Sequence, residues 1–193
     1  MPNLQFYRTS TSAMKNHEMD VEYLADSSVD AALDTQIRRL LTTCFTKPED
    51  VVFKDQRYFI EPYPHRWVIR NMQGSLIAHI GVHEKTVEAD GRYFRIGGIA
   101  EVCVHPDFRG RGFVKKMLAC VHDWLVRNKF DFAVLFGDPR IYGSSGYVQM
   151  NNLAHDDATA TGESCMSQSP VMVRPLTETL WPGEQVYLPG PKF

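Results

Sequence analysis

The spacing of hydrophobic residues divides the chain into strands and helices. The run Met19 to Ala25 alternates well enough for a short strand, and apolar residues recur every three or four positions from about Asp30 to Phe45, which predicts a helix. Three apolar strands separated by turns at Gln73-Gly74 and Asp90-Gly91 follow: Trp67–Asn71, Ser75–Glu84 and Tyr93–Val104. The first half therefore predicts a helix beside an antiparallel meander.

The second half of the chain changes to an α/β pattern. Helical spacing resumes at Val114 and reaches about Asn128, and the short apolar run Phe132–Phe136 fits a buried parallel strand. A helix between two such strands implies a right-handed crossover. Four further segments are predicted as an aromatic loop, a mobile polar loop and two short closing strands: Glu49–Arg66, Asp156–Ser169, Val171–Val173 and Gln185–Leu188.

Composition limits the classes of protein that fit this pattern. With 193 residues, 44% of them hydrophobic, the chain suits one domain over residues 1–193. A formal net charge of −2 gives no positive field, which disfavours nucleic-acid and membrane partners. The polar start Met1–Lys15 lacks an apolar leader, so we expect a cytoplasmic protein, with homodimerisation left open. The four cysteines form no CxxC pair, which predicts reduced structural thiols: Cys44, Cys103, Cys120 and Cys165.

The clearest chemical signal is an apolar strand end followed by a Gly/Arg-rich loop and the start of a helix. It reads Val102-Cys103-Val104-His105-Pro106-Asp107-Phe108-Arg109-Gly110-Arg111-Gly112-Phe113-Val114. Glycines let backbone N–H groups approach an anion, the helix start adds unpaired donors, and the arginines add positive charge. The segment lacks the endings of nucleoside-triphosphate and dinucleotide loops, so a different pyrophosphate cofactor is indicated. A flexible turn or an RNA-contacting patch is the alternative, and the net charge disfavours RNA.

This segment resembles the pyrophosphate loop of the GNAT (GCN5-related N-acetyltransferase) superfamily, Arg/Gln-x-x-Gly-x-Gly/Ala after a Val-x-Pro strand end. Arg109 and Gly112 match, whereas Val114 stands where the family usually has Gly or Ala. Downstream, Phe136-Gly137-Asp138-Pro139 and Ile141-Tyr142-Gly143-Ser144-Ser145-Gly146-Tyr147 look like the family's strand, short helix and Tyr-x-x-x-Gly-Phe/Tyr ending. The motifs cover about Ile99 to Tyr147.

The resemblance implies an α/β GNAT fold, with a central mixed, mostly antiparallel sheet flanked by helices. Coenzyme A would lie in a V-shaped opening between two parallel strands, the one ending at Val104 and the one from Phe132. Its pantetheine arm would pair with the backbone of Val102, Cys103 and Val104, and its pyrophosphate with the loop from Arg109 through Gly110, Arg111, Gly112 and Phe113 to Val114.

The resemblance also implies roles for individual side chains. The family's tyrosine at the place of Tyr142 protonates the departing thiolate, and a phenol at neutral pH is a suitable donor. An attacking amine must lose its proton, and Glu101 is the first candidate base, with His105 or a water chain as alternatives. His79 and His83 lie in a strand-like pattern, where a spacing of four does not create a metal site, so no metal is expected.

The predicted function is transfer of an acetyl group from acetyl-CoA to a primary amine of a small molecule. The ending Leu180–Pro191 resembles that of aminoglycoside 2'-N-acetyltransferases and nodulation N-acyltransferases, which favours an amino sugar or aminoglycoside. A longer-chain N-acyltransferase of the same fold and a non-catalytic acyl-CoA sensor are the alternatives.

Overall fold

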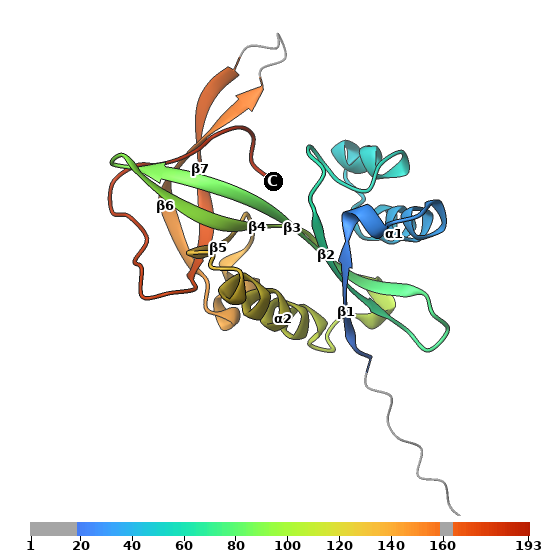
Figure 1. The fold of residues 1–193 in the computed structure, drawn as a ribbon. Coiled ribbons are helices and arrows are strands. Elements are labelled where there is room, and N and C mark those ends of the chain that lie inside the picture. Colours follow the sequence, from blue (N-terminus) through green and yellow to red (C-terminus); the bar gives the residue numbers. More distant parts are fainter. Residues whose placement is uncertain (1–18, 159–163) are drawn as a thin grey trace, which may run out of the picture.

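The computed structural model describes residues 19–158 and 164–193; the predicted polar start Met1–Lys15 and residues 159–163 lie outside the described residues. Eight strands form one sheet in the order β1-β2-β3-β4-β5-β7-β6-β8 (Figure 1). The strands are β1 (Val21–Ala25), β2 (His65–Arg70), β3 (Leu76–Ala89), β4 (Arg92–Val104), β5 (Phe132–Leu135), β6 (Val148–Ala158), β7 (Ser164–Pro175) and β8 (Val186–Leu188). The helices are α1 (Ala31–Cys44), α2 (Phe113–Arg127) and the one-turn α3 (Pro139–Tyr142).

The sheet is mixed and mostly antiparallel, as predicted. Among the described strands, β4–β5 and β6–β8 pair in parallel, and the other neighbours pair antiparallel. The parallel β4–β5 pair arises because α2 connects these two strands across the sheet, which is the predicted crossover. The prediction of an α/β fold with flanking helices is therefore confirmed.

The helices α1 and α2 cover opposite faces of the sheet, because successive residues of a strand point to opposite sides. Val68 of β2 packs with the buried face of α1, whereas its neighbours Trp67 and Ile69 pack with α2. Helix α2 approaches closely at Gly97, where a Cβ atom would lie 2.4 Å from Leu125 Cδ2. In Figure 1, α2 runs beneath the centre of the sheet and α1 lies against β2.

The predicted boundaries hold best where local chemistry fixes them. The Asp30 carboxylate accepts from the Leu33 amide (2.8 Å) and caps α1 at its predicted start. Asp90 and Gly91 both have positive φ (48° and 69°), which suits the tight β3–β4 hairpin. In the predicted aromatic loop, the first part forms a 3₁₀ helix, Pro48–Lys54, and β2 already begins at His65.

The prediction of a mobile loop over Asp156–Ser169 is wrong for its described part. Strand β6 continues to Ala158 and β7 begins at Ser164, and Asp156 pairs with Met166 in an antiparallel register. This paired end extends from the sheet (Figure 1). The register of the described residues is set by backbone pairing, which small polar residues do not reveal as an apolar strand pattern.

Two features of β4 position the site. Its parallel pairing with β5 ends at Ile99 and Leu135, although β4 continues to Val104. Its register with β3 shifts between His79 and Gly81, which places a β-bulge at Glu101. The backbone on the β5 side is therefore unpaired beyond Ile99 and available to a ligand.

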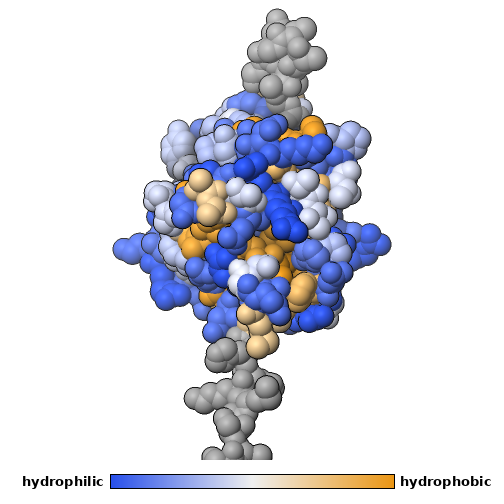
Figure 2. Space-filling view, turned by 90° about the vertical axis from the view of Figure 1, so that its right-hand side faces the viewer, coloured by the Kyte–Doolittle hydropathy of each residue, from blue (hydrophilic) through white to orange (hydrophobic). Residues whose placement is uncertain are grey.

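The molecular surface in the view of Figure 2 carries hydrophobic patches between hydrophilic residues. None of the helices within residues 19–158 and 164–193 is long and apolar enough to cross a membrane.

Candidate functional site

The loop between β4 and α2 has the backbone geometry of an anion cradle. Gly110 and Gly112 have φ of 74° and 77°, and nothing lies within 4 Å of the Cβ that either would carry. Gly112 is the N-cap of α2 without a side-chain cap, so the first amides of the helix have no intrahelical acceptor. These amides and the positive end of the helix dipole favour a phosphate group.

The two arginines of this loop are held by the loop itself. Arg109 Nε donates to the Val104 carbonyl (3.1 Å), and Arg111 Nη2 donates to the Asp107 carbonyl (3.1 Å). The Arg111 guanidinium also lies 4.9 Å from the centre of the Phe108 ring. Neither arginine forms an ion pair with a carboxylate in the described part of the chain, so their positive charges remain available to an anion.

A cavity of about 350 Å³ joins this loop to the end of β4. All nine residues predicted to bind the cofactor line it: Val102, Cys103, Val104, Arg109, Gly110, Arg111, Gly112, Phe113 and Val114. Val114, the departure from the family pattern, is half-buried, packs against the core and contributes to the wall of the cavity. The size of the cavity and its glycine backbone fit a pantetheine arm with a pyrophosphate at the helix start.

Tyr142 stands where this cavity meets a smaller one. It lines the cofactor cavity and also a pocket of about 140 Å³ around Ala100 and Glu101. Its ring packs on Gly137, where a Cβ atom would lie 2.4 Å from Cε2. Burial raises the pKa of Tyr142 to about 12, with a smaller effect from Cys103. The phenol is therefore protonated at neutral pH.

Glu101 lines the smaller pocket and has an unusual environment. Its φ of 42° is rare for a residue with a side chain, and its Oε1 accepts from the Phe59 amide (2.9 Å). Oε2 is buried and accepts no hydrogen bond from any described residue, because the nearby Tyr63 hydroxyl donates to the Arg57 carbonyl. Burial raises the pKa of Glu101 to about 7, although the hydrogen bond from the Phe59 amide opposes this shift.

A buried polar cluster lies behind Glu101. His79 Nδ1 lies 3.0 Å from the Glu101 carbonyl oxygen, and the fully buried Arg66 contacts His79 Nε2 at 3.2 Å. Arg66 also donates to Asp26 Oδ1 (2.6 Å) and to the Tyr63 hydroxyl (2.8 Å). Burial lowers the pKa of His79 to about 3, so this ring is neutral. The cluster fixes the bulged backbone that carries Glu101.

The structure separates the two candidate bases. His105 lines neither the cofactor cavity nor the pocket of Glu101; it faces another cavity, between α1 and the β2–β3 turn.

His79 and His83 are both buried, and within the described residues no group of His, Cys, Asp and Glu side chains is arranged to hold a metal. Cys44, Cys103 and Cys120 are free thiols.

Sequence reasoning missed several residues of the site because they come from distant segments. Cys44 and Phe45, at the end of α1, line the cofactor cavity. The rings of Phe136 and Phe193 pack edge to face, with centroids 5.3 Å apart, and line the pocket of Glu101. The hydrophobic spacing of α1 predicted that the end of this helix is buried, but it did not indicate that the helix end lines a cofactor cavity.

Comparison with known proteins gives the family. The family model described as "Acetyltransferase (GNAT) domain" matches residues 27–150. A search of curated protein sequences gave no significant match.

Solved structures share the fold at low sequence identity. The GNAT family N-acetyltransferase YhbS from Escherichia coli, in complex with CoA, is 18% identical with a TM-score of 0.63; the alignment covers 91% of this chain and 92% of that one. A GNAT family acetyltransferase from Brucella melitensis, in complex with acetyl-CoA, is 16% identical with a TM-score of 0.56, covering 88% and 96%. An acyl-CoA N-acyltransferase from Pseudomonas aeruginosa is 14% identical with a TM-score of 0.55, covering 81% and 99%.

The family match spans most of the chain. It includes the glycine loop, Tyr142 and the end of β4, which lines both the cofactor cavity and the pocket of Glu101. The protein therefore belongs to the GNAT family of acetyltransferases.

Proposed function

We propose that the protein, acting as one domain, transfers an acetyl group from acetyl-CoA directly to a primary amine of a small molecule. The observation that carries this proposal is the position of Tyr142, which lines both the cofactor cavity and the pocket of Glu101. Donor and acceptor would then meet beside a protonated phenol. The pocket volume of about 140 Å³ favours a short acyl group over a long chain.

The glycine loop would hold the pyrophosphate, with the amides of Phe113 and Val114 and the charges of Arg109 and Arg111 as partners. The unpaired edge of β4 at Val102–Val104 would pair with the pantetheine arm, in an opening between β4 and β5. Acetyl-CoA, when bound, supplies the acetyl group as a thioester. The remaining steps, removal of a proton from the amine and protonation of the thiolate, would be carried out by side chains.

Glu101 would take the proton that the amine must lose before its nitrogen can form the new C–N bond. Its pKa of about 7 suits a base near neutral pH, and its unpaired Oε2 is free to accept that proton. Tyr142 would give its proton to the thiolate sulfur as the C–S bond breaks. The two roles require opposite protonation states, and burial provides them: a phenol that stays protonated and a carboxyl that ionises near pH 7.

Two classes of amine fit the proposed acceptor. An amino sugar or aminoglycoside is one class suggested by the segment Leu180–Pro191, while the aromatic walls Phe45, Phe136 and Phe193 would also suit an amine with an apolar body. A thiol-release assay with acetyl-CoA across amino sugars, aminoglycosides, arylalkylamines and amino acids would identify the class. Longer acyl-CoA donors belong in the same screen.

Tyr142→Phe tests the proposal. The variant keeps the ring on Gly137 and removes only the acid, so turnover at saturating acetyl-CoA should fall about tenfold to a thousandfold while CoA affinity is retained. Tyr147→Phe is the matched control, because its hydroxyl instead bonds His122 Nε2 at 2.8 Å. Parent-like turnover in Tyr142→Phe would refute the acid role, and an absence of turnover in the parent with every amine would favour the acyl-CoA sensor.

A further inference from the structure

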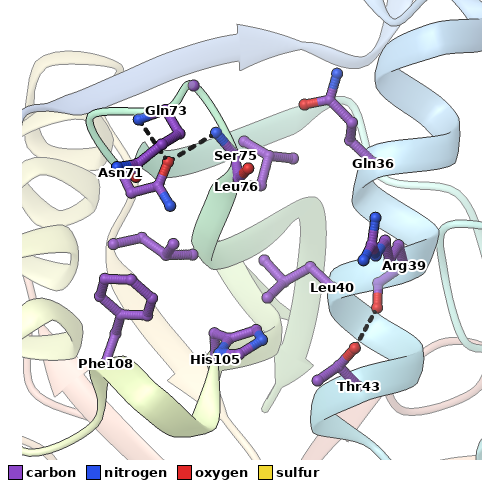
Figure 3. Close-up of a pocket in the computed structure, with 12 residues that line it drawn as sticks. Gln36, Arg39, Leu40, Thr43, Asn71, Gln73, Ser75, Leu76, His105 and Phe108 are labelled. Carbon is purple, nitrogen blue, oxygen red and sulfur yellow. Dashed lines mark hydrogen bonds between the residues drawn. The ribbon is translucent and has the colours of Figure 1, made fainter.

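A cavity larger than the cofactor cavity lies outside the proposed transfer site. It has a volume of about 450 Å³ and opens between α1, the β2–β3 turn and the start of the β4–α2 loop (Figure 3). Neither Tyr142 nor Glu101 lines it. Phe108 lines both this cavity and the cofactor cavity, so a ligand here would contact the segment that leads into the glycine loop.

Internal hydrogen bonds fix which polar atoms the cavity can offer. Asn71 Oδ1 accepts from the amides of Gln73 (3.0 Å) and Ser75 (2.9 Å), as the dashed lines in Figure 3 show, so its NH₂ group is left to donate. Gln36 Oε1 accepts from Arg70 Nη1 (3.1 Å), which likewise leaves its NH₂ group. In each of these two side-chain amides, the NH₂ group is therefore the part that can donate a hydrogen bond to a ligand.

A hydrogen bond also fixes which ring nitrogen of His105 can donate. Its Nδ1 accepts from the Asp107 amide (3.3 Å), so the proton of the neutral ring sits on Nε2. The Asp107 carboxylate lies 3.8 Å from Nδ1 and does not line the cavity. His105 can thus donate from Nε2 whether the ring is neutral or protonated.

Arg39 supplies a positive charge that no carboxylate of the described residues pairs with. Its neighbour Arg38 pairs with Asp34, but the Arg39 guanidinium forms no ion pair or hydrogen bond with another side chain in the described chain. None of the residues that surround the cavity is acidic. An ammonium group would therefore meet the like charge of Arg39 and no carboxylate here, which separates this cavity from the acceptor pocket of the proposed reaction.

The base of the cavity is apolar. It consists of Leu40 of α1, Leu76 and Ile77 of β3 and the ring of Phe108, and Figure 3 shows Leu40, Leu76 and Phe108 among the polar side chains. A ligand that matches both parts has an anionic head that accepts several hydrogen bonds and an apolar body. A fully ionic ligand such as inorganic phosphate would leave the apolar base against water.

We propose that this cavity binds a small organic carboxylate, with the carboxylate toward Arg39 and His105 and the apolar body against Leu76 and Phe108. The inference does not depend on the transfer reaction, because it concerns a separate cavity and is tested by binding alone.

The test is calorimetric titration of the full-length protein with phenylacetate and with phenylacetamide, which has nearly the same shape without the charge. We expect saturable one-to-one binding of phenylacetate and at least tenfold weaker binding of phenylacetamide. Arg39→Gln should weaken phenylacetate binding at least tenfold. Arg127→Gln is the matched control, since it removes the same charge from an exposed position on α2 and should change affinity less than twofold.

A second variant tests the position of the ligand without changing charge. Ser75→Trp fills the cavity from the β2–β3 turn and should abolish phenylacetate binding, while circular dichroism and CoA titration check that Arg39→Gln and Ser75→Trp are folded. The proposal is overturned by equal affinities for phenylacetate and phenylacetamide, by equal effects of Arg39→Gln and Arg127→Gln, by undiminished binding to folded Ser75→Trp, or by no saturable binding of phenylacetate to the parent protein.

Discussion

Glu101 combines two properties that a solvated strand glutamate would not have. Its backbone is in the left-handed region, with φ of 42°, and its Oε2 is buried without a hydrogen-bond donor among the described residues. Both properties cost free energy, of order 1–3 kcal/mol for the backbone alone. The His79 and Arg66 contacts behind the bulge offset that cost. Strain held in this way at the wall of a pocket is typical of a functional position.

The raised pKa of Glu101 gives a pH prediction for activity. Glu101→Gln imitates the protonated carboxyl, so the variant and the parent should have similar turnover well below pH 7. Above pH 7 the parent should be faster by about a hundredfold, as expected for a lost general base. The pH–rate profile of both proteins checks this, with the exposed Glu84→Gln as control. A profile that Glu101→Gln leaves unchanged would remove Glu101 from the mechanism in favour of ordered water.

The same pKa predicts a change in stability. Glu101 has a pKa of about 7 in the folded protein and 4.5 when exposed in the unfolded chain, so the folded state is increasingly disfavoured as pH rises from 4.5 to 7. Glu101→Gln should therefore stabilise the protein relative to the parent at pH 8, and by less at pH 5. Urea unfolding at both pH values measures the difference.

At the scale of elements, the β4–α2 segment acts as one unit. Strand β4 ends in unpaired backbone, the loop turns through two left-handed glycines, and α2 starts at Gly112. The position of α2 is in turn set by its close contact with β4 at Gly97. The loop and the helix start are thus held against the strand whose edge would bind the cofactor.

Gly112→Glu should abolish CoA binding. A side chain at φ of 77° strains the turn, and a carboxylate at the helix start repels the diphosphate. Gly91→Glu is the matched control, because Gly91 also has positive φ (69°) and no neighbour within 4 Å, but lies at the β3–β4 hairpin. Calorimetry on both folded variants decides the matter; normal CoA affinity in Gly112→Glu would refute the pyrophosphate assignment.

Gly97→Ala should destabilise the packing of α2 on the sheet. The added Cβ would lie 2.4 Å from Leu125 Cδ2, and overpacking of this kind costs about 1–3 kcal/mol of unfolding free energy. Gly183→Ala adds a methyl group where nothing lies within 4 Å and should be close to neutral. Urea denaturation compares the two variants. Equal midpoints would contradict the prediction and show that Leu125 and α2 adjust to the added methyl group without cost.

At the scale of the whole molecule, buried histidines make the fold sensitive to acid. Burial lowers the pKa of His79 to about 3 and the pKa values of His83 and His122 to about 4, against 6.5 for an exposed imidazole. Between pH 6.5 and 4 the unfolded chain therefore binds protons that the folded chain does not. Stability should fall as pH decreases through this range, although the proton that folded Glu101 retains opposes the trend.

Urea unfolding free energies between pH 5 and 6 test this expectation. Each buried histidine adds up to about 1.4 kcal/mol per pH unit to the slope. His122→Gln removes one titrating group, so its slope should be smaller than that of the parent by about that amount. An unchanged slope would show that His122 is protonated in the folded protein.

Much of the fold was readable from local patterns, because each of these signals depends on near neighbours. The caps and hydrophobic spacing of α1 and α2, the hairpin at Asp90-Gly91 and the glycine loop all involve residues a few positions apart. The paired ends of β6 and β7 were missed because hydrogen bonding between backbones, rather than an apolar face, defines them.

Local sequence patterns indicated the helix and strand periods, the glycine loop with Gly112 at a helix start, and Tyr142 within a recognisable motif. The assembled sheet places Tyr142 between two cavities, brings Phe59 into contact with Glu101, and turns His105 away from both cavities. The physical reason is that hydrophobic spacing and turn chemistry act over a few residues. The pKa of a carboxyl and the walls of a cavity depend on segments that approach each other only when the sheet has formed.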